Sequence, residues 1–532
     1  MPKFLFMNPL VLLAIHLGYA GIANGFNIRC KLIKKKYNEQ TNIKIETFDS
    51  KKLAAQIYVP KQYCFPGLRP AIIFANSWTR PESQYEAQAK KFANKGYLVL
   101  GYATRGFGNS EGQASGAGPN DIKDVSTIID WLEANTLVDP ERVGMTGVSY
   151  GGGISLMALA NDERIATATS LSSWTNLKKS FYENNTVRKV FLKILISTGE
   201  WTGSIDPELK EVYRRLKNHD RVEGALSWAE IRSPIEVIEK INQRNAPVLL
   251  ANNYRDYLFP PEQNLDFFKG LTTPKRFIVS NGIHASAEFP GFYGFNIGVW
   301  QDIHRWYDHW FLDIENGITA EPPIALNTPD GLELYDTMPP AKANPGMFSL
   351  DPKNQVEAAD EWSARSGVSI KSSYLSGATN GIPLLSSLLH SHTPIKIIAW
   401  LDALNRNHKA IYYTRELSEM VQIRGIPRLR IPIEPKNESM QIITYLYEVN
   451  RFGLGTLLTH GVATFRDLTP GKAFNYELKL AATANNIDKG NRVAVVIDTT
   501  DPLYGDTKVK DFAFKIIHDN EDNLEILIPE IP

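Results

Sequence analysis

Gly147-Val148-Ser149-Tyr150-Gly151, followed by Gly152 and Gly153, is the stretch of sequence that decides the fold. It comes directly after Val143-Gly144-Met145-Thr146, which is typical of a strand, and opens a segment with helical periodicity. Glycines two residues before and after the serine let a strand and a helix approach closely, as in a nucleophile elbow. We therefore predict that Ser149 is a nucleophile; the alternative is a tight turn whose serine has no chemical role.

The sequence around this motif alternates between strand-like and helical stretches. Residues 43–60 form two alternating runs that predict a hairpin joined at Asp49-Ser50. Strands alternating with helices predict a largely parallel α/β sheet. The further expected strands are 71–75, 97–102, 247–251 and 276–280, and the expected helices are 85–94, 121–134 and 300–312.

Two regions depart from this rhythm. Residues 176–243 are charged, helical in period and without a strand-like run, which predicts a helical cap inserted over the sheet. Beyond Pro394, strand signals follow one another without helices, which predicts a β-sandwich. The predicted division is a signal peptide at 1–23, an α/β domain at 38–175 and 244–320 interrupted by the cap at 176–243, a linker and start of the last domain at 321–393, and the β-sandwich at 394–532.

The composition is that of a soluble globular protein. Of 532 residues, 43% are hydrophobic and 22% charged, which excludes disordered, collagenous and multi-span membrane classes. The formal net charge is +0, so no overall field attracts nucleic acid. With only two cysteines and no Cys/His cluster at zinc spacing, we expect no metal and no cofactor. The sequence leaves the oligomeric state open.

The first 20 residues have a charged start, an apolar run and small residues suited to cleavage after Ala20 or Ala23. This pattern predicts a signal peptide and a secreted or periplasmic protein, in which Cys30 and Cys64 are free to form a disulfide. Asn8, Pro9 and His16 interrupt the apolar run and basic residues follow it, so a cytoplasmic location is the alternative.

A serine nucleophile needs a base, and the base needs an acid that fixes its tautomer. Asp256 follows the strand at 247–251, and His284 follows the strand at 276–280. Both then lie at the sheet edge that presents Ser149, in the chain order serine, acid, histidine. Asp266 competes as the acid, but it falls within an expected helix.

The other nine histidines are placed less well. His304 and His309 fall on the aromatic helix at 300–312, and the rest lie in the leader, the cap or the β-rich half. The oxyanion of the reaction needs two donors. We predict the backbone N–H of Tyr150 as one and the loop Asn76-Ser77-Trp78-Thr79-Arg80 as the source of the other.

With these residues, the chain resembles the X-Pro dipeptidyl-peptidase and cocaine esterase (CocE/NonD) family of α/β-hydrolases. The resemblance rests on the elbow and on three further segments, at 104–112, 139–144 and 425–430. It implies a catalytic α/β domain, a helical cap between nucleophile and acid, and a C-terminal jelly roll.

Two positions depart from the family pattern. Cocaine-esterase-like members carry a tyrosine where this chain has Trp78, and the hydroxyl of that tyrosine is an oxyanion donor. Here the second donor is expected to be the Trp78 indole N–H or a backbone amide. Family members commonly carry an aspartate two residues before the arginine that corresponds to Arg105, and this chain has Ala103 there. Arg105 therefore lacks one partner and is interpreted as structural.

The resulting hypothesis is a serine hydrolase that cleaves an ester or amide bond of a small-molecule ester or peptide substrate through an acyl-enzyme on Ser149. We favour an X-Pro dipeptidyl-peptidase-like hydrolase; a carboxylesterase of cocaine-esterase type acting on small acyl esters is the alternative, and a non-catalytic binding protein on the same fold is a third. A dipeptidyl-peptidase needs a carboxylate for the substrate amine, for which the cap offers Glu183, Glu200 and Glu211, while an esterase needs an apolar acyl pocket, for which it offers Trp201 and Trp228.

Overall fold

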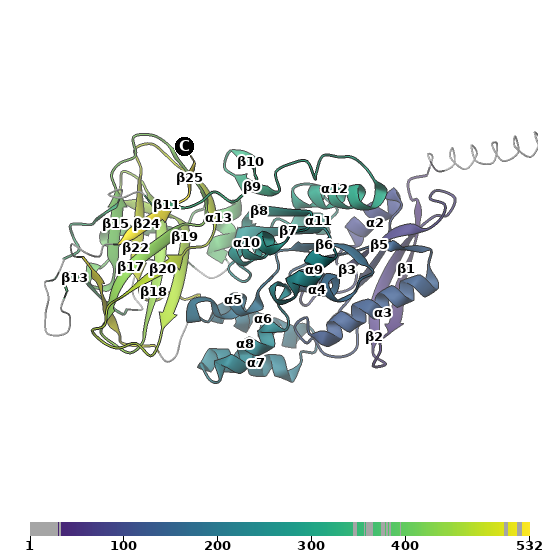
Figure 1. Ribbon diagram of the computed structural model, residues 1–532, viewed down its shortest axis with the longest axis horizontal. Helices are drawn as coiled ribbons and strands as arrows, with labels where there is room; N and C mark the ends of the chain where they lie inside the picture. Colours follow the sequence, from purple (N-terminus) through teal and green to yellow (C-terminus); the bar gives the residue numbers. More distant parts are fainter. Residues whose placement is uncertain are drawn as a thin grey trace, which may run out of the picture.

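The computed structural model is divided into an α/β unit, a helical cap and an all-β unit (Figure 1). It describes residue 30, residues 33–343, 348–355 and 357, residues 365–373, 378 and 381, and residues 385–393, 395–504, 509–518 and 524–531. The expected signal peptide at 1–23 lies outside these residues. No helix of the described residues is long and apolar enough to cross a bilayer.

The α/β unit is built on a ten-stranded sheet that is parallel from β4 to β9 and antiparallel at both edges. The expected hairpin at 43–60 is confirmed by the antiparallel pairing of β1 and β2. The strands, in spatial order, are β1 (Tyr37–Glu46), β2 (Lys52–Pro60), β4 (Leu98–Tyr102), β3 (Arg69–Ala75), β5 (Val138–Val148), β6 (Ile165–Leu171), β7 (Val248–Arg255), β8 (Lys275–Ile283), β9 (Ile324–Thr328) and β10 (Gly331–Tyr335).

Helices cover both faces of this sheet, so every residue of β3 is buried, and the strand is apolar throughout after Arg69. Ile72 and Phe74 of β3 pack in the cluster that contains α2 and α12, whereas Ile73 packs on the opposite side with α3 and α4. The helices of the unit are α2 (Glu86–Lys95), α3 (Pro119–Asn135), α4 (Tyr150–Asn161), α10 (Pro261–Gly270), α11 (Phe289–Phe292) and α12 (Val299–Leu312).

The sheet extends past residue 320, where the sequence predicted the start of a linker. β9 pairs with β8 in parallel and β10 returns as the antiparallel edge strand, so residues 324–335 belong to the α/β unit. The strand β9 is short and follows a Pro-Pro pair, which is why its pattern reads as a connection.

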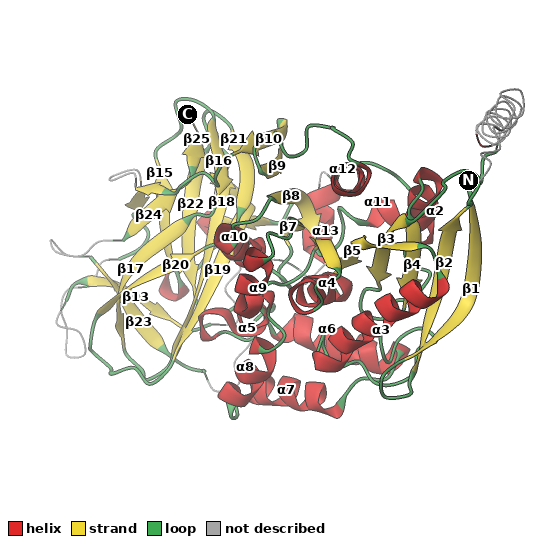
Figure 2. Ribbon diagram, turned by 45° about the vertical axis from the view of Figure 1, so that its right-hand side comes forward, coloured by secondary structure: helices red, strands yellow, loops and turns green. Residues whose placement is uncertain are grey.

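The cap consists of helices inserted between β6 and β7 (Figure 2). Its α7 is strongly amphipathic and buries Leu209, Val212 and Leu216, the apolar stripe at helical spacing. The cap elements are α5 (Leu177–Tyr182), η1 (Glu183–Asn185), α6 (Lys189–Thr202), α7 (Pro207–Asn218), α8 (Val222–Glu230), η2 (Pro234–Val237) and α9 (Ile238–Gln243).

The all-β unit is made of antiparallel strands in two six-stranded sheets and one three-stranded sheet, and it lies beside the α/β unit. Its core joins the two larger sheets, for example through Ile433 of β17 and Val495 of β22. Its elements are β11 (Lys342–Ala343), β12 (Phe348–Leu350), β13 (Gly367–Lys371), α13 (Leu385–His392), β14 (Ile398–Trp400), η3 (Leu401–Ala403), η4 (Arg406–His408), β15 (Ala410–Thr414), β16 (Val421–Gly425), β17 (Arg428–Pro435), β18 (Met440–Val449), β19 (Leu454–Phe465), β20 (Phe474–Lys479), β21 (Thr483–Ile487), β22 (Arg492–Asp498), β23 (Ala513–Ile517), β24 (Glu525–Ile528) and β25 (Glu530–Ile531). The predicted fold class is confirmed: an α/β sheet with an inserted helical cap, followed by an all-β domain.

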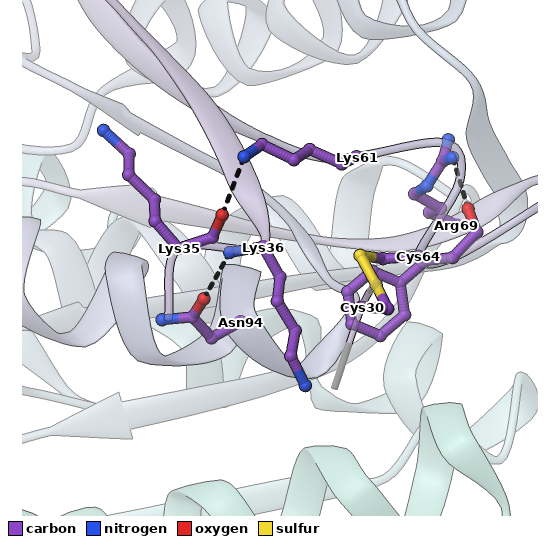
Figure 3. The surroundings of a disulfide bond; sticks show 8 residues. Cys30, Lys35, Lys36, Lys61, Cys64, Arg69 and Asn94 are labelled. Atoms are coloured by element: carbon purple, nitrogen blue, oxygen red, sulfur yellow. Dashed lines mark hydrogen bonds between the residues drawn. A yellow bond between two sulfur atoms is a disulfide. The ribbon is translucent and has the colours of Figure 1, made fainter. Parts of the chain in front are cut away.

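A disulfide joins Cys30 to Cys64 and fixes the chain that precedes β1 to the loop after β2 (Figure 3). Nearby, Lys61 Nζ donates to the carbonyl of Lys35 at 2.8 Å and the Lys36 N–H donates to Asn94 Oδ1 at 2.9 Å. The N-terminal arm is therefore tied to the edge of the sheet by one covalent link and several hydrogen bonds.

Candidate active site

Ser149 lies at the turn between β5 and α4, with φ 58° and ψ −117°. A non-glycine residue in this region is strained, and the turn is held by its close neighbours. A Cβ on Gly147 would lie 2.1 Å from the carbonyl carbon of Gly151, and a Cβ on Gly151 would lie 2.1 Å from the Ala75 carbonyl oxygen. Both glycines are therefore required by the close crossing of strand and helix, as the sequence predicts.

His284 lies between Ser149 and Asp256. Its Nε2 is 2.9 Å from Ser149 Oγ, and its Nδ1 is 2.8 Å from Asp256 Oδ2. Asp256 is fully buried, and its Oδ1 accepts hydrogen bonds from the N–H groups of Phe259 (2.9 Å) and Leu258 (3.2 Å). The three residues that the sequence selected thus form one continuous hydrogen-bonded chain.

Burial lowers the pKa of His284, but the charge and the hydrogen bond of Asp256, together with the charge of Glu288, outweigh burial, so the pKa of His284 is raised above its ordinary value. A second carboxylate, Glu288, adds to this rise. Glu288 is buried, and its two oxygens accept hydrogen bonds from Ser172 Oγ (2.8 Å) and Asn253 Nδ2 (3.2 Å). Sequence analysis missed Glu288, because a lone glutamate in a loop before an aromatic segment carries no signal.

His304 and Asp266, the rejected candidates for the base and the acid, have other partners. His304 is buried, stacks on Phe92 and lies 3.0 Å from Gln88 Oε1, and burial lowers its pKa to about 3. Asp266 pairs with Lys179 at 2.6 Å on the surface of α10. Neither contacts the Ser149 chain of hydrogen bonds.

Arg105 lies in a buried ion-pair cluster. It donates to Asp124 Oδ2 at 2.5 Å and to Asp49 Oδ2 at 2.7 Å, so two aspartates from α3 and from the turn after β1 replace the partner absent at Ala103. This agrees with its interpretation as a structural residue.

The indole N–H of Trp78 is engaged with the cap. Its Nε1 donates to the carbonyl of Leu195 at 2.9 Å, so the expectation that this group is an oxyanion donor is wrong. No hydrogen bond of the described residues uses the backbone N–H of Trp78 or of Tyr150. Both amides stay available as donors, as does the N–H of Thr79 in the same loop, and the Tyr150 hydroxyl is occupied by Asp121 at 3.1 Å.

Two pockets meet at Ser149. The inner pocket, about 50 Å³, lies under the cap and is lined almost entirely by apolar side chains, among them Trp78, Trp174, Phe181, Leu195 and Trp228. The outer pocket, about 850 Å³, is lined by His284, Arg80 and the aromatic residues of α11. It is also lined by Leu389 and His392 of α13, although the sequence placed that segment in a linker.

No aspartate or glutamate lines either pocket among the described residues. The cap carboxylates that the sequence offered lie elsewhere: Glu200 pairs with Lys210 at 2.8 Å, Glu211 with Arg214 at 2.6 Å, and Glu183 with Arg188 at 2.9 Å. Of the two cap tryptophans, Trp228 lines the inner pocket, whereas Trp201 is 86% exposed.

An α/β sheet with a strained serine elbow and a serine, histidine and aspartate in hydrogen-bond contact defines a serine hydrolase of the α/β-hydrolase fold. Residues 49–286 match the family model of the X-Pro dipeptidyl-peptidases (S15 family), and residues 344–510 match that of the X-Pro dipeptidyl-peptidase C-terminal non-catalytic domain. The chain is therefore similar to the X-Pro dipeptidyl-peptidases in both its catalytic part and its C-terminal part.

Individual relatives are distant in sequence. A putative Xaa-Pro dipeptidyl-peptidase of Streptomyces avermitilis is 22% identical over 475 residues, 77% of this chain and 68% of the relative. Among solved structures, an α-amino acid ester hydrolase matches with a TM-score of 0.67 and 14% identity, covering 93% of this chain and 97% of the other. A CocE/NonD family hydrolase from Staphylococcus aureus matches with a TM-score of 0.63 and 11% identity, covering 92% and 94%. The structural matches establish the shared two-domain fold.

Proposed function

We propose that this hydrolase acts on esters that combine a short apolar acyl group with a large leaving group. The observation that carries this proposal is the contrast between the two pockets at Ser149: the inner one is narrow and apolar, and the outer one is wide. A substrate amine would need a carboxylate in one of them, and among the described residues neither is lined by one. The esterase alternative is therefore favoured over the dipeptidyl-peptidase reading.

In this proposal Ser149 is the nucleophile, His284 the base and Asp256 the acid that orients it. His284 Nε2 takes the proton of the Ser149 hydroxyl as the oxygen attacks the ester carbonyl. The backbone amides of Trp78 and Tyr150 stabilise the oxyanion. Collapse of the tetrahedral intermediate transfers the proton from His284 to the departing alcohol, and water activated by His284 then releases the acid.

The position of His284 indicates which pocket would receive the acyl group and which the leaving group. The leaving oxygen receives its proton from His284 Nε2, so the leaving group must lie on the His284 side. His284 lines the outer pocket and not the inner one. The acyl group therefore occupies the inner pocket, where a cavity of about 50 Å³ admits only a few heavy atoms.

The decisive experiment compares p-nitrophenyl acetate, butyrate and octanoate with Gly-Pro-p-nitroanilide, using Ser149→Ala as the matched blank. We expect serine-dependent hydrolysis of the two short esters, weaker hydrolysis of the octanoate, and negligible release from the anilide. Hydrolysis of the anilide at a rate comparable with butyrate would contradict the ester proposal and favour a dipeptidyl-peptidase. Absence of both serine-dependent activity and fluorophosphonate labelling at Ser149 would instead favour the non-catalytic binding protein.

We also propose that the protein is exported to an oxidising compartment. The leader-like pattern at 1–23 and the pairing of Cys30 with Cys64 support this location, since structural disulfides persist mainly outside the cytosol.

A further inference from the structure

The turn that carries Asp256 lies between the active site and the all-β unit, because His284 contacts it through Asp256 and His460 packs against it through Tyr257. Asp256 is followed at once by Tyr257, whose N–H donates to the carbonyl of Arg255 at 3.0 Å. The turn is closed internally by the bonds from Leu258 and Phe259 to the Asp256 carboxylate. The carbonyl of Tyr257, the residue next to Asp256, takes no part in these two hydrogen bonds.

Arg188, from the cap just before α6, holds that carbonyl. Its Nη1 donates to the Tyr257 carbonyl at 3.2 Å, and its Nη2 donates to Glu183 Oε2 at 2.9 Å. The same Nη1 lies 3.5 Å from the hydroxyl of Tyr504, which belongs to the all-β unit. The Arg188 side chain is only 7% exposed, so these contacts are shielded from water.

The all-β unit makes one further contact with this turn and one with helix α10, which follows it. The His460 ring of β19 packs edge-on against the Tyr257 ring, with 4.5 Å between centroids, and its Nε2 lies 2.7 Å from the Tyr504 hydroxyl. Glu262, at the start of α10, accepts a hydrogen bond from the backbone N–H of Ala482. The turn is thus held on one side by the cap and on the other by the β-sandwich.

We infer that Tyr504 and Arg188 are positioning residues, through which the C-terminal β-sandwich fixes the orientation of Asp256 toward His284. This inference rests on the proposed role of Asp256 as the catalytic acid. It assigns to the domain a part in turnover without any contact with the substrate: neither residue lines a pocket at Ser149.

A displaced Asp256 would change the pH profile of kcat/KM, whereas a loss of stability alone would not. Asp256 raises the pKa of His284, so a weaker contact between them lowers that pKa and moves the acid limb of kcat/KM to lower pH. The ionisable groups that act on His284 are Asp256 and Glu288, and those that act on Arg188 are Tyr504, Glu183 and Glu262. Tyr504→Phe leaves all of these charges in place, because burial raises the pKa of Tyr504 far above the assay range.

The chain offers a matched control in the same domain. The hydroxyl of Tyr412 lies 2.7 Å from His518 Nε2, the same contact that Tyr504 makes with His460, but Tyr412 lies on β15 within the sandwich. Both Tyr→Phe changes remove one buried hydroxyl next to a histidine. Only Tyr504→Phe disturbs the link to Arg188.

The experiment measures kcat, KM and the pH profile for each variant with p-nitrophenyl butyrate, normalised to active sites counted with a fluorophosphonate. We expect Tyr504→Phe to lower kcat about tenfold, with KM within about twofold and the acid limb at lower pH. Tyr412→Phe should leave kcat and the acid limb unchanged. Arg188→Lys, which keeps the charge but cannot reach both carbonyl and carboxylate, should shift the profile in the same direction and serves if Tyr504→Phe does not fold.

Equal kinetics for the two tyrosine variants, or a lower kcat with an unmoved acid limb, would overturn the inference and leave Tyr504 a residue of stability alone. Failure of the proposed function is a separate outcome, since the wild-type protein would then neither hydrolyse the ester nor react with the fluorophosphonate.

Discussion

The indole N–H of Trp78 donates its hydrogen bond to the backbone carbonyl of Leu195, 2.9 Å away in α6 of the cap. The ring also packs edge-on against Phe107 (4.6 Å) and Tyr150 (5.1 Å), so its orientation is fixed from three sides. A cocaine-esterase-like tyrosine would place a hydroxyl in the oxyanion hole at this position, whereas the tryptophan ties the cap to the elbow. In the proposed mechanism the oxyanion then depends on main-chain donors.

Replacing Trp78 by Phe is therefore expected to cost little in chemistry. Loss of a true oxyanion donor lowers kcat by about 10²–10³, whereas Trp78→Phe should lower kcat less than about tenfold, because the backbone N–H stays in place. Steady-state kinetics with p-nitrophenyl acetate check this. A decrease of kcat by 10² or more, with unchanged thermal stability, would indicate that the indole N–H is an oxyanion donor.

The elbow and its partners were predictable because their positions follow from topology. Ser149, Asp256 and His284 each lie just after a strand with a clear apolar pattern, and parallel strands bring their carboxyl ends to one edge. The pocket walls were harder to predict. They come from the cap and from α13. The spacing of apolar residues in these helices indicates that one face is apolar, but it does not indicate what that face contacts.

The elements that sequence analysis missed had weak local patterns. In β19 the run Leu454–Phe465 contains two glycines and three threonines, and its burial comes from pairing with β18 rather than from apolar alternation. Glu288 and Arg188 likewise gain important partners through tertiary contacts: Ser172 is 116 positions from Glu288, and Tyr257 is 69 positions from Arg188.

Trp228 is expected to set the length of the acyl group. Its indole Nε1 donates to Glu208 at 3.1 Å, Arg232 stacks 3.7 Å above the ring, and a Cβ on Gly116 would lie 2.5 Å from its edge. The ring is thus a fixed wall of the inner pocket. Trp228→Leu should raise the ratio of kcat/KM for octanoate over butyrate about tenfold or more, since each added methylene gains a place to bind.

Trp201→Ala provides the control for this change, because Trp201 is 86% exposed and lines neither pocket at Ser149. The chain-length ratio should stay at the wild-type value in that variant. An unchanged ratio in Trp228→Leu as well would contradict the assignment of the inner pocket to the acyl group.

Glu288 is expected to control the pH at which activity is lost. His284 acts as a base only when neutral, so kcat/KM falls as the pH drops through its raised pKa. The Glu288 carboxylate contributes to that rise; Glu288→Gln removes the charge and should move the acid limb to lower pH. Glu200→Gln, which removes one charge from an exposed pair with Lys210, should leave the limb unmoved. A shift to higher pH, or equal shifts in both variants, would show that Glu288 does not act on His284 through its charge.

The disulfide is expected to matter for stability and not for turnover. Cys30 and Cys64 are 34 positions apart, and closing a loop of that size restricts the unfolded chain by about 3–4 kcal/mol. Neither cysteine lines a pocket at Ser149, so Cys64→Ser should lower the melting temperature while leaving kcat and KM of the active enzyme unchanged. The wild-type protein recovered from an oxidising compartment should show no free thiol when it is alkylated under denaturing conditions. After reduction it should show two. Two free thiols without reductant would contradict both the pairing and the proposed export, whereas a fall in kcat in Cys64→Ser would mean that the N-terminal arm reaches the active site through the sheet edge.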